Sequence, residues 1–308
     1  MEHIGTILNG AYRIAEKLRE DWSCQVYRAH AVSGGDAVDA TIIKREALSG
    51  RLEGTIRFRS EMETVRDFDH PAIVRALQAG EQFGTVYVVS ARCDAPQLSG
   101  VMRDAAGDVP RALAISVDLC RALAYAHGRG VLHRGIRPDA VMAGRDGAML
   151  AGFGLAHVVE CAAATSPEDR ATLFGYLAPE QSGLIRKRVD ERSDLYQLGV
   201  LLYHLTTGRL PITGDSVTAI VHRHLTQVPE PPARVNTRLP AVLDRIIMRL
   251  LEKDPDRRYQ SATGLCADLE RLIGGNDDFI PGLDDHASRI ELGGPLIGRE
   301  TEFERLTR

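Results

Sequence analysis

The chain has 308 residues, of which 44% are hydrophobic and 26% are charged, and this balance is typical of a globular protein with a buried core. A net charge of −4 and an isoelectric point near 6.2 argue against nucleic-acid binding, which usually leaves a strongly basic footprint. The cysteines are odd in number and dispersed, so they predict neither a disulfide framework nor a zinc site. They are Cys24, Cys93, Cys120, Cys161 and Cys266. The chain shows no signal-peptide pattern and no apolar run near the ~20 residues that span a bilayer, so we expect a cytoplasmic protein.

The first ninety residues are rich in predicted strands. β-Branched and aromatic residues lie between turn signals such as Ser33-Gly34-Gly35-Asp36, a pattern typical of strands. The strands are expected at residues 12–18, 25–30, 37–44, 73–79 and 85–90, with one helix at 52–67 that ends near His70-Pro71. Several strands interrupted by one helix predict a small antiparallel-sheet lobe.

Helices dominate from Pro110 onward. Ile115, Leu119, Leu123 and Ala126 recur at helical spacing, which predicts an amphipathic helix before a glycine stop. Further helices are expected at residues 194–207, 216–227, 240–251 and 261–273, the first of them strongly apolar and the last capped by Ser261. These elements predict a larger, mainly helical lobe. After Ile273 the composition turns to Gly, Asn, Asp and Pro, which is typical of a linker, here assigned to residues 274–294.

Two short motifs lie one predicted hairpin apart in the middle of the chain. They read His133-Arg134-Gly135 and Gly152-Phe153-Gly154. Their spacing and the residues between them resemble the catalytic loop (H-R-D-x-K-P-x-N) and the metal-binding loop (D-F-G) of Ser/Thr protein kinases.

Other ordered motifs extend this resemblance over about residues 12–273. Thr41-Ile42-Ile43-Lys44 resembles the strand with the phosphate-holding lysine, and Glu61 resembles the helix glutamate that pairs with it. The resemblance implies an α+β, bilobal kinase-like fold over residues 1–273, with lobes at about 10–92 and 93–273. It also implies structural roles for His133, Arg134 and Glu180, the last in the motif Ala178-Pro179-Glu180. Asp194 is implied to brace the catalytic loop, and Arg258 to pair with Glu180.

The chemical positions of that family are altered in this chain. Gly135 stands at the catalytic Asp, Arg137 at the Lys, Ala140 at the metal-binding Asn and Gly152 at the metal-binding Asp. Phosphoryl transfer depends on metal ions that bridge the phosphates and on a carboxylate that orients the acceptor. The three glycines of the nucleotide-covering loop fall on Arg19, Asp21 and Cys24, where side chains obstruct a close backbone approach to phosphates. The sequence therefore predicts a catalytically degraded pseudokinase, without a resident metal or cofactor.

Two alternatives remain open at this stage. The candidates for nucleotide binding are Lys44, Glu61 and Ser90. If these residues bind ATP, the chain is either a divergent active Ser/Thr kinase or a sensor that binds ATP weakly or without metal. In the structural interpretation, Lys44 and Glu61 only brace the small lobe. Thr165, Ser166 and Thr172 are candidate phosphoacceptors, with Arg134 as the receiver of the phosphate. A plain loop is the simpler interpretation of that segment.

The last stretch carries a second resemblance. Residues 294–300 read Gly-Pro-Leu-Ile-Gly-Arg-Glu and are similar to the lead-in of an AAA/STAND-type signalling ATPase. Phe279-Ile280-Pro281-Gly282 also resembles the linkers of large bacterial signalling proteins that join such domains. The resemblance implies that residues 295–308 begin an ATPase domain, which would be the partner of the kinase-like domain alongside other signalling proteins. An ordinary amphipathic tail helix is the alternative.

Overall fold

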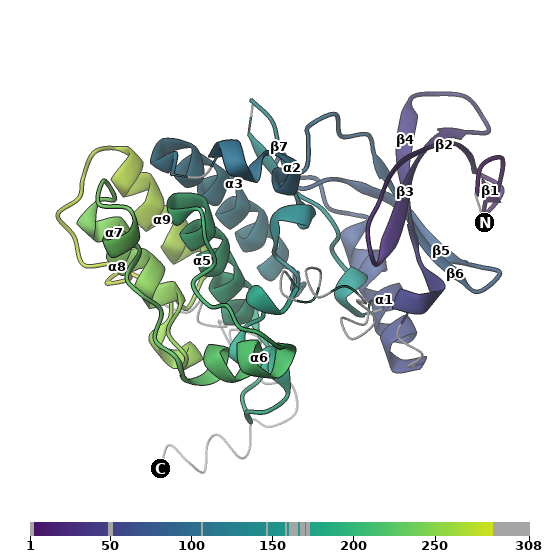
Figure 1. Cartoon of the computed structure of the whole chain (residues 1–308). Coiled ribbons are helices and arrows are strands. Elements are labelled where there is room, and N and C mark those ends of the chain that lie inside the picture. Colours follow the sequence, from purple (N-terminus) through teal and green to yellow (C-terminus); the bar gives the residue numbers. More distant parts are fainter. Residues whose placement is uncertain are drawn as a thin grey trace, which may run out of the picture.

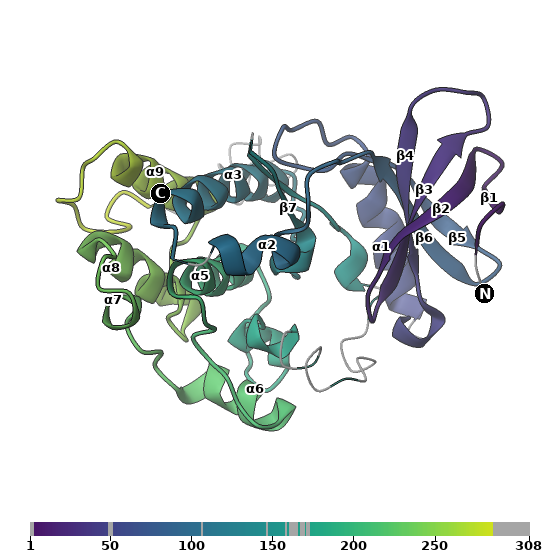
Figure 2. The ribbon, with the colours of Figure 1, turned by 45° about the horizontal axis from the view of Figure 1, so that its top comes forward.

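The computed structural model describes residues 3–48, 52–105, 107–145, 147–157, 159, 166, 170 and 173–285. They form two lobes, a sheet-rich lobe at the N-terminal end and a helical lobe (Figure 1). Figure 2 shows the same division after a 45° turn, with α1 beside the sheet of the small lobe. The predicted bilobal α+β fold is confirmed.

The small lobe is a six-stranded antiparallel sheet in the order β1-β2-β3-β4-β6-β5. Successive side chains of a strand point to opposite faces. On β4, Val38, Ala40 and Ile42 therefore join one buried cluster, while Ile43 joins the core that includes α1. The bounds are β1 Ile7–Leu8, β2 Tyr12–Glu20, β3 Cys24–Ala31, β4 Ala37–Ile43, η1 Arg45–Ala47, α1 Leu52–Val65, β5 Ala76–Gln82 and β6 Thr85–Ala91.

The large lobe is built around α5, which packs between α3 and α8 and is buried along most of its length. Asp108, Ser216 and Ser261 cap α3, α6 and α9 by accepting a backbone N–H of the first turn. The helices are α2 Leu98–Ala105, α3 Val109–His127, α5 Glu191–Thr207, α6 Val217–Thr226, α7 Pro232–Val235, α8 Ala241–Leu250 and α9 Ala262–Ile273. A hairpin, β7 Val141–Ala143 with β8 Ala148–Leu150, and the short helices η2 Pro138–Ala140, η3 Leu155–His157, η5 Pro179–Ser182 and η6 Pro255–Arg257 complete the lobe.

Residues 276–285, here called the C-terminal strap, lie in the segment expected to be a linker but pack on the large lobe. Phe279 packs against the large-lobe core. The Nη1 of Arg249 donates to the carbonyl of Pro281 at 2.8 Å, and the Gly282 amide donates to the buried Oδ2 of Asp268 at 2.6 Å. At the end of the strap, Asp285 accepts a hydrogen bond of 2.8 Å from the Ser261 hydroxyl. The described half of the expected linker is therefore held to α8 and α9.

No helix in the described part of the chain has the length and apolar character needed to cross a bilayer. Residues 294–308, where the ATPase-like lead-in was expected, lie outside the described residues.

Candidate functional site: the cleft between the lobes

A cavity of about 690 Å³ separates the small lobe from the large one. Its small-lobe wall comes from β2, β3 and β4, and its large-lobe wall comes from three segments that the fold brings back to the same place: residues 133–140, 151–156 and 177–189. The degenerate positions Gly135, Arg137, Ala140 and Gly152 all line it. The structure therefore brings together in one cleft the positions that the kinase resemblance selected.

Asp194 at the start of α5 holds the loop at residues 133–135. Its fully buried carboxylate accepts the amide of His133 at 2.8 Å, the amide of Arg134 at 2.6 Å and Nε2 of His127 at 2.9 Å. Burial alone raises the pKa of the Asp194 carboxyl, but the hydrogen bond and charge of His127 outweigh it and hold that pKa below its usual value. The carboxylate thereby fixes Arg134 in the left-handed region, at a φ of 62°. This is the bracing arrangement that the resemblance implies for Asp194.

His133 is buried, and burial lowers its pKa. Its Nε2 donates to the carbonyl of Ala151 at 2.9 Å, and its ring meets Phe153 edge-on with centroids 4.7 Å apart. A neutral imidazole in these contacts is a packing residue of the loop.

The position of the catalytic acid has a cation beside it instead. A Cβ atom built on Gly135 would have the Nη1 of Arg137 as its nearest neighbour, at 3.8 Å. The same guanidinium pairs with Asp139, with 3.3 Å between Nε and Oδ2. Asp139 and Asp21 are the acidic residues among the described ones that line the cavity. In the same part of the chain, no group of three or more His, Cys, Asp or Glu side chains could hold a metal ion.

Asp21 satisfies the backbone of the loop that would cover a nucleotide. Its Oδ1 accepts the Ser23 amide at 2.6 Å, the Ser23 hydroxyl at 2.8 Å and the Cys24 amide at 2.8 Å. These amides are donors of the kind that bind phosphate, but here a carboxylate of the same loop occupies them. Burial, with the nearby Asp21 charge, raises the pKa of the Cys24 thiol to about 12, so the thiol is unreactive at neutral pH.

The predicted ion pair between Lys44 and Glu61 is wrong. β4 ends at Ile43, and its cleft-facing side chains are Thr41 and Ile43. Lys44 lies one residue past the strand, and its Nζ pairs with Oε1 of Glu20 at 2.6 Å. Because side chains alternate along a strand, the residues on either side of Ile43 cannot share its cleft-facing direction. The alternation of polar Thr41 and apolar Ile42 was the sequence signal that could have shown this. Lys44 is two residues after Ile42, so it points to the same side of the strand as Ile42 and away from the cleft.

Glu61 on α1 pairs with His157 instead. The Oε2 of Glu61 lies 2.7 Å from Nε2 of His157, and Nη1 of Arg134 lies 2.6 Å from the same Nε2 and 3.0 Å from Nδ1 of His157. The guanidinium of Arg134 and the carboxylate of Glu61 thus meet at the same ring nitrogen of His157. This chain of three residues joins α1, η3 and the loop before Gly135. Nothing in the sequence pattern singled out His157.

The region around Ser90 offers little room. A cavity of about 60 Å³ there is lined by Asp39, Thr41 and Ser90 among others. Asp39 is buried, and its Oδ1 lies 3.2 Å from Nε of Arg28. An acidic residue and a small volume both disfavour a nucleobase at this place.

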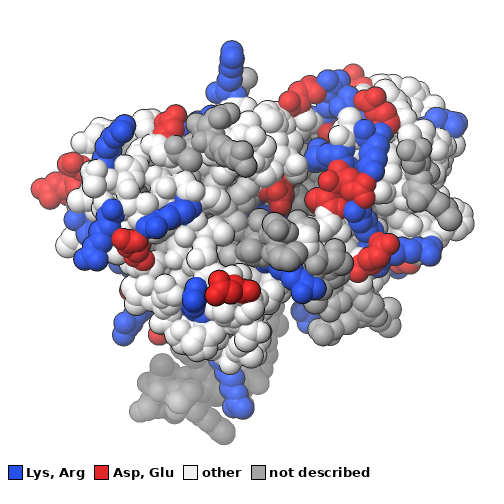
Figure 3. Space-filling view, in the orientation of Figure 1, with Lys and Arg blue, Asp and Glu red and all other residues white. Residues whose placement is uncertain are grey.

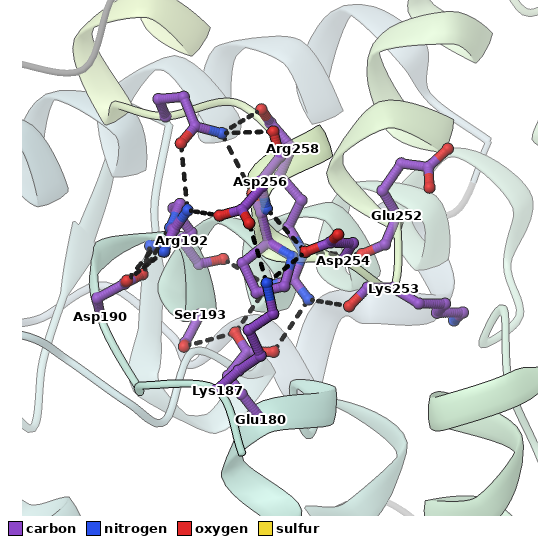
Figure 4. A network of polar contacts seen from close by, with 12 residues as sticks. Glu180, Lys187, Asp190, Arg192, Ser193, Glu252, Lys253, Asp254, Asp256 and Arg258 are labelled. Atoms are coloured by element: carbon purple, nitrogen blue, oxygen red, sulfur yellow. Dashed lines mark hydrogen bonds and ion pairs between the residues drawn. The ribbon is translucent and has the colours of Figure 1, made fainter. Parts of the chain in front are cut away.

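A buried ion pair fixes the outer edge of the cleft (Figure 4). Arg258 donates from Nη1 and Nη2 to the two oxygens of Glu180, at 2.7 and 3.0 Å, and both side chains are fully buried. Ser193 adds a hydrogen bond of 2.6 Å to Oε1 of Glu180. Lys187 and Arg192 surround the pair with contacts to Asp254, Asp256 and Asp190. Losing one partner of a buried, bidentate ion pair strongly destabilises a folded protein. This network therefore anchors residues 180–192 to η6. Of the candidate phosphoacceptors, Thr165 and Thr172 lie outside the described residues, and Ser166 is described.

A sequence profile of the protein kinase domain matches residues 12–268. The chain belongs to the protein kinase family. It is 32% identical over 276 residues to a probable serine/threonine-protein kinase of Streptomyces coelicolor, covering 87% of this chain and 41% of that protein. It is 33% identical over 260 residues to the serine/threonine-protein kinase PknB of Mycobacterium tuberculosis, covering 80% of this chain and 41% of that protein.

Among solved structures, the chain is similar to the PknI kinase domain of Mycobacterium tuberculosis, with a TM-score of 0.70, 25% identity, and coverage of 87% of this chain and 98% of that one. This likeness supports the fold. The chain spans about two fifths of the length of the curated relatives it matches.

Proposed function

We propose that this protein is a pseudokinase: a regulatory or scaffolding module of signal transduction that does not transfer phosphate. The observation that carries the proposal is the composition of the cleft. Where the kinase family has its acceptor-orienting Asp and its metal-holding Asn and Asp, this chain has Gly135, Ala140 and Gly152, and the guanidinium of Arg137 lies beside the first of them. Magnesium is typically held by carboxylates together with substrate phosphates, and neither remaining cleft carboxylate is free of a partner.

Two further features support the proposal. Thr41 and Ile43, not a lysine, face the cleft from β4, so none of the described lining residues offers an ammonium group to hold phosphates. The loop amides of Ser23 and Cys24 are occupied by Asp21. Catalysis of phosphoryl transfer is mostly positioning and charge neutralisation, and each part that supplies these is replaced.

A phosphotransfer assay tests this proposal. The protein is incubated with γ-labelled ATP and Mg²⁺ or Mn²⁺, with itself and a general protein substrate as acceptors, beside an active bacterial serine/threonine kinase. We expect no incorporation above background. Incorporation that disappears in the Asp139→Asn variant would overturn the proposal and favour the divergent active kinase, because Asp139 is the carboxylate nearest to Gly135 in the chain.

A nucleotide sensor without turnover is the second candidate, and the preserved cleft is the observation in its favour. Thermal-shift measurements with millimolar ATP, with Mg²⁺ and with a chelator, decide it, because a ligand that binds only the folded state stabilises it by an amount that grows with the logarithm of its concentration over its affinity. An upward shift of several degrees with ATP but not with AMP would favour the sensor. An unchanged melting temperature under both conditions would rule out the nucleotide sensor.

We further propose that the module acts on an ATPase domain that follows it in the same polypeptide. The kinase-like order of elements followed by the lead-in at residues 294–300 supports this. The test adds the purified kinase-like module to the separately purified downstream part of the natural protein and measures ATP hydrolysis by that part. A rate that does not respond to the module would contradict the proposal.

A further inference from the structure

The lining of the cleft carries an excess of positive charge. Among the described residues that line it, the charged side chains are five arginines and two aspartates: Arg19, Arg57, Arg134, Arg137, Arg188, Asp21 and Asp139. On the face shown in Figure 3, Lys and Arg alternate with Asp and Glu over the small lobe, and the whole chain is slightly acidic. The positive excess is thus a property of the cleft and not of the molecule as a whole.

Both aspartates are already engaged. Asp21 accepts the loop amides, and Asp139 pairs with Arg137 at 3.3 Å. Among the described residues, Arg19 and Arg188 form no ion pair with a side chain that would neutralise them. The cleft can therefore accept negative charge from a ligand without a metal ion, since guanidinium groups are the side chains best suited to bind phosphate.

The position of the positive charge indicates the kind of ligand. The guanidinium of Arg137 lies beside Gly135, where a kinase would orient the hydroxyl group that receives phosphate. From there the 690 Å³ cavity continues to Leu177, Gln181 and Val189, on the large-lobe side. The opposite side, around Ser90 and Asp39, offers only about 60 Å³. The larger cavity thus extends to the place where an acceptor segment would be.

We propose that this cleft binds a phosphorylated peptide segment without a divalent cation, with the phosphate beside Gly135 and in contact with Arg137, and with Arg188 and Arg19 adding positive charge. The inference rests on the proposed loss of phosphotransfer, because a working kinase would keep this place for an unphosphorylated hydroxyl. By this inference, the module recognises a peptide that another kinase has phosphorylated. No bond is made or broken in this step.

Fluorescence anisotropy tests the proposal on the full 308-residue chain. The probe is a labelled degenerate peptide with a central phosphoserine, and the matched probe carries serine. We expect the phosphorylated probe to bind at least about tenfold more tightly, because a charge-assisted bidentate contact is roughly twice as strong as a neutral one. Affinity should fall with added salt and remain the same in a chelator.

Three variants locate the site. Arg137→Gln and Arg188→Gln should each reduce the preference for the phosphorylated probe, and Arg238→Gln, an exposed arginine before α8, should leave it unchanged. Melting temperatures of all three should agree within a few degrees, since Arg188 has no described ion-pair partner and Arg137 pairs only with the partly exposed Asp139.

The outcomes separate this inference from the proposed function. Equal binding of both probes, or an Arg137→Gln variant that binds like the unaltered chain, would overturn the inference and leave the pseudokinase proposal intact. Competition by ATP in a chelator that is stronger than competition by free phosphopeptide would overturn it in favour of a nucleotide ligand. Incorporation of labelled phosphate, measured separately, would overturn the proposed function itself.

Discussion

The Nε2 atom of His157 lies 2.7 Å from Oε2 of Glu61, so the glutamate of α1 is held by the turn after Phe153 and not by a lysine of the sheet. Glu61 Oε1 is buried and has no hydrogen-bond partner among the described residues. His157 therefore provides the hydrogen bond of the Glu61 carboxylate, and it links α1 to the large-lobe loop that carries Arg134.

Replacing His157 with Phe should destabilise the protein by about 1–3 kcal/mol, the usual cost of leaving a buried polar group without its partner. Urea unfolding followed by circular dichroism measures this change. The double variant His157→Phe with Glu61→Leu is the control, and it should recover much of the loss because no carboxylate is then left buried. A single variant as stable as the unaltered chain would show that Glu61 finds another partner.

Two cleft glycines should respond differently to alanine. Gly152 has a φ of 89°, in the left-handed region, whereas Gly135 has an ordinary φ, and a Cβ atom placed on it would have no neighbour closer than 3.8 Å. Gly152→Ala should cost about 1–2 kcal/mol through backbone strain, and Gly135→Ala should be within about 0.5 kcal/mol of the unaltered chain. Equal costs, measured by thermal unfolding, would contradict the strained backbone at residue 152.

The stability of the large lobe should depend on the ionisation of His224. Burial, with a smaller effect of the Lys253 charge, lowers the pKa of His224 to about 3, and its Nδ1 lies 2.8 Å from the hydroxyl of Tyr196. In the unfolded chain the histidine has a pKa near 6.5. Between these two values the unfolded state binds the extra proton, so the free energy of unfolding is fully retained above pH 6.5 and falls as the pH decreases toward 3.

His224→Gln removes this titration and keeps a hydrogen-bonding side chain. The stability difference between the unaltered chain and this variant should shrink by up to about 1.4 kcal/mol per pH unit below pH 6.5. Urea unfolding at pH values from about 7.5 down to about 4.5 measures the slope. Parallel pH profiles for the two proteins would mean that His224 is not buried in its neutral form.

The C-terminal strap should be released by one methyl group. A Cβ atom on Gly264 would overlap the carboxylate of Asp285. Gly264→Ala improves helix propensity by up to about 1 kcal/mol, yet it should make the strap more susceptible to limited proteolysis after residue 275. In the Asp285→Gly background, which removes every side-chain atom of residue 285, the same substitution should no longer do so. Unchanged cleavage in both backgrounds would contradict the close packing of the strap on α9.

Much of the fold could be predicted from the sequence because it depends on local patterns. The run at 194–207 is strongly apolar, and the structure buries it as α5 between α3 and α8. Ser261 was expected as a cap, and it accepts the Gly264 amide at 3.0 Å. The strand expected from Ile73 begins instead at Ala76, after an isolated bridge between Ile73 and Leu150. Such a bridge is a contact between distant residues, which periodicity cannot show.

The site was less predictable, because its decisive contacts join residues far apart in the chain. Lys44 was assigned to the cleft by its motif. Because side chains alternate along a strand, Lys44 points away from the cleft and pairs with Glu20 instead of Glu61. His157 meets Glu61 across 96 positions. The loss of the family's catalytic and metal-binding side chains at Gly135, Ala140 and Gly152, by contrast, could be read directly from residue identity. Identity at motif positions is a sequence property, but the pairing of charges is a property of the folded chain.

The strap also connects α9 to the charge network around Glu180 and Arg258. Asp285 accepts the Ser261 hydroxyl and the amide of Gln260, whose side chain is in hydrogen-bonding contact with Arg192. Asp285, the last residue of the strap, thus lies at the first turn of α9, beside the charge network that anchors residues 180–192. A ligand that displaces this network would therefore also disturb the hydrogen bonds that hold Asp285 on the large lobe.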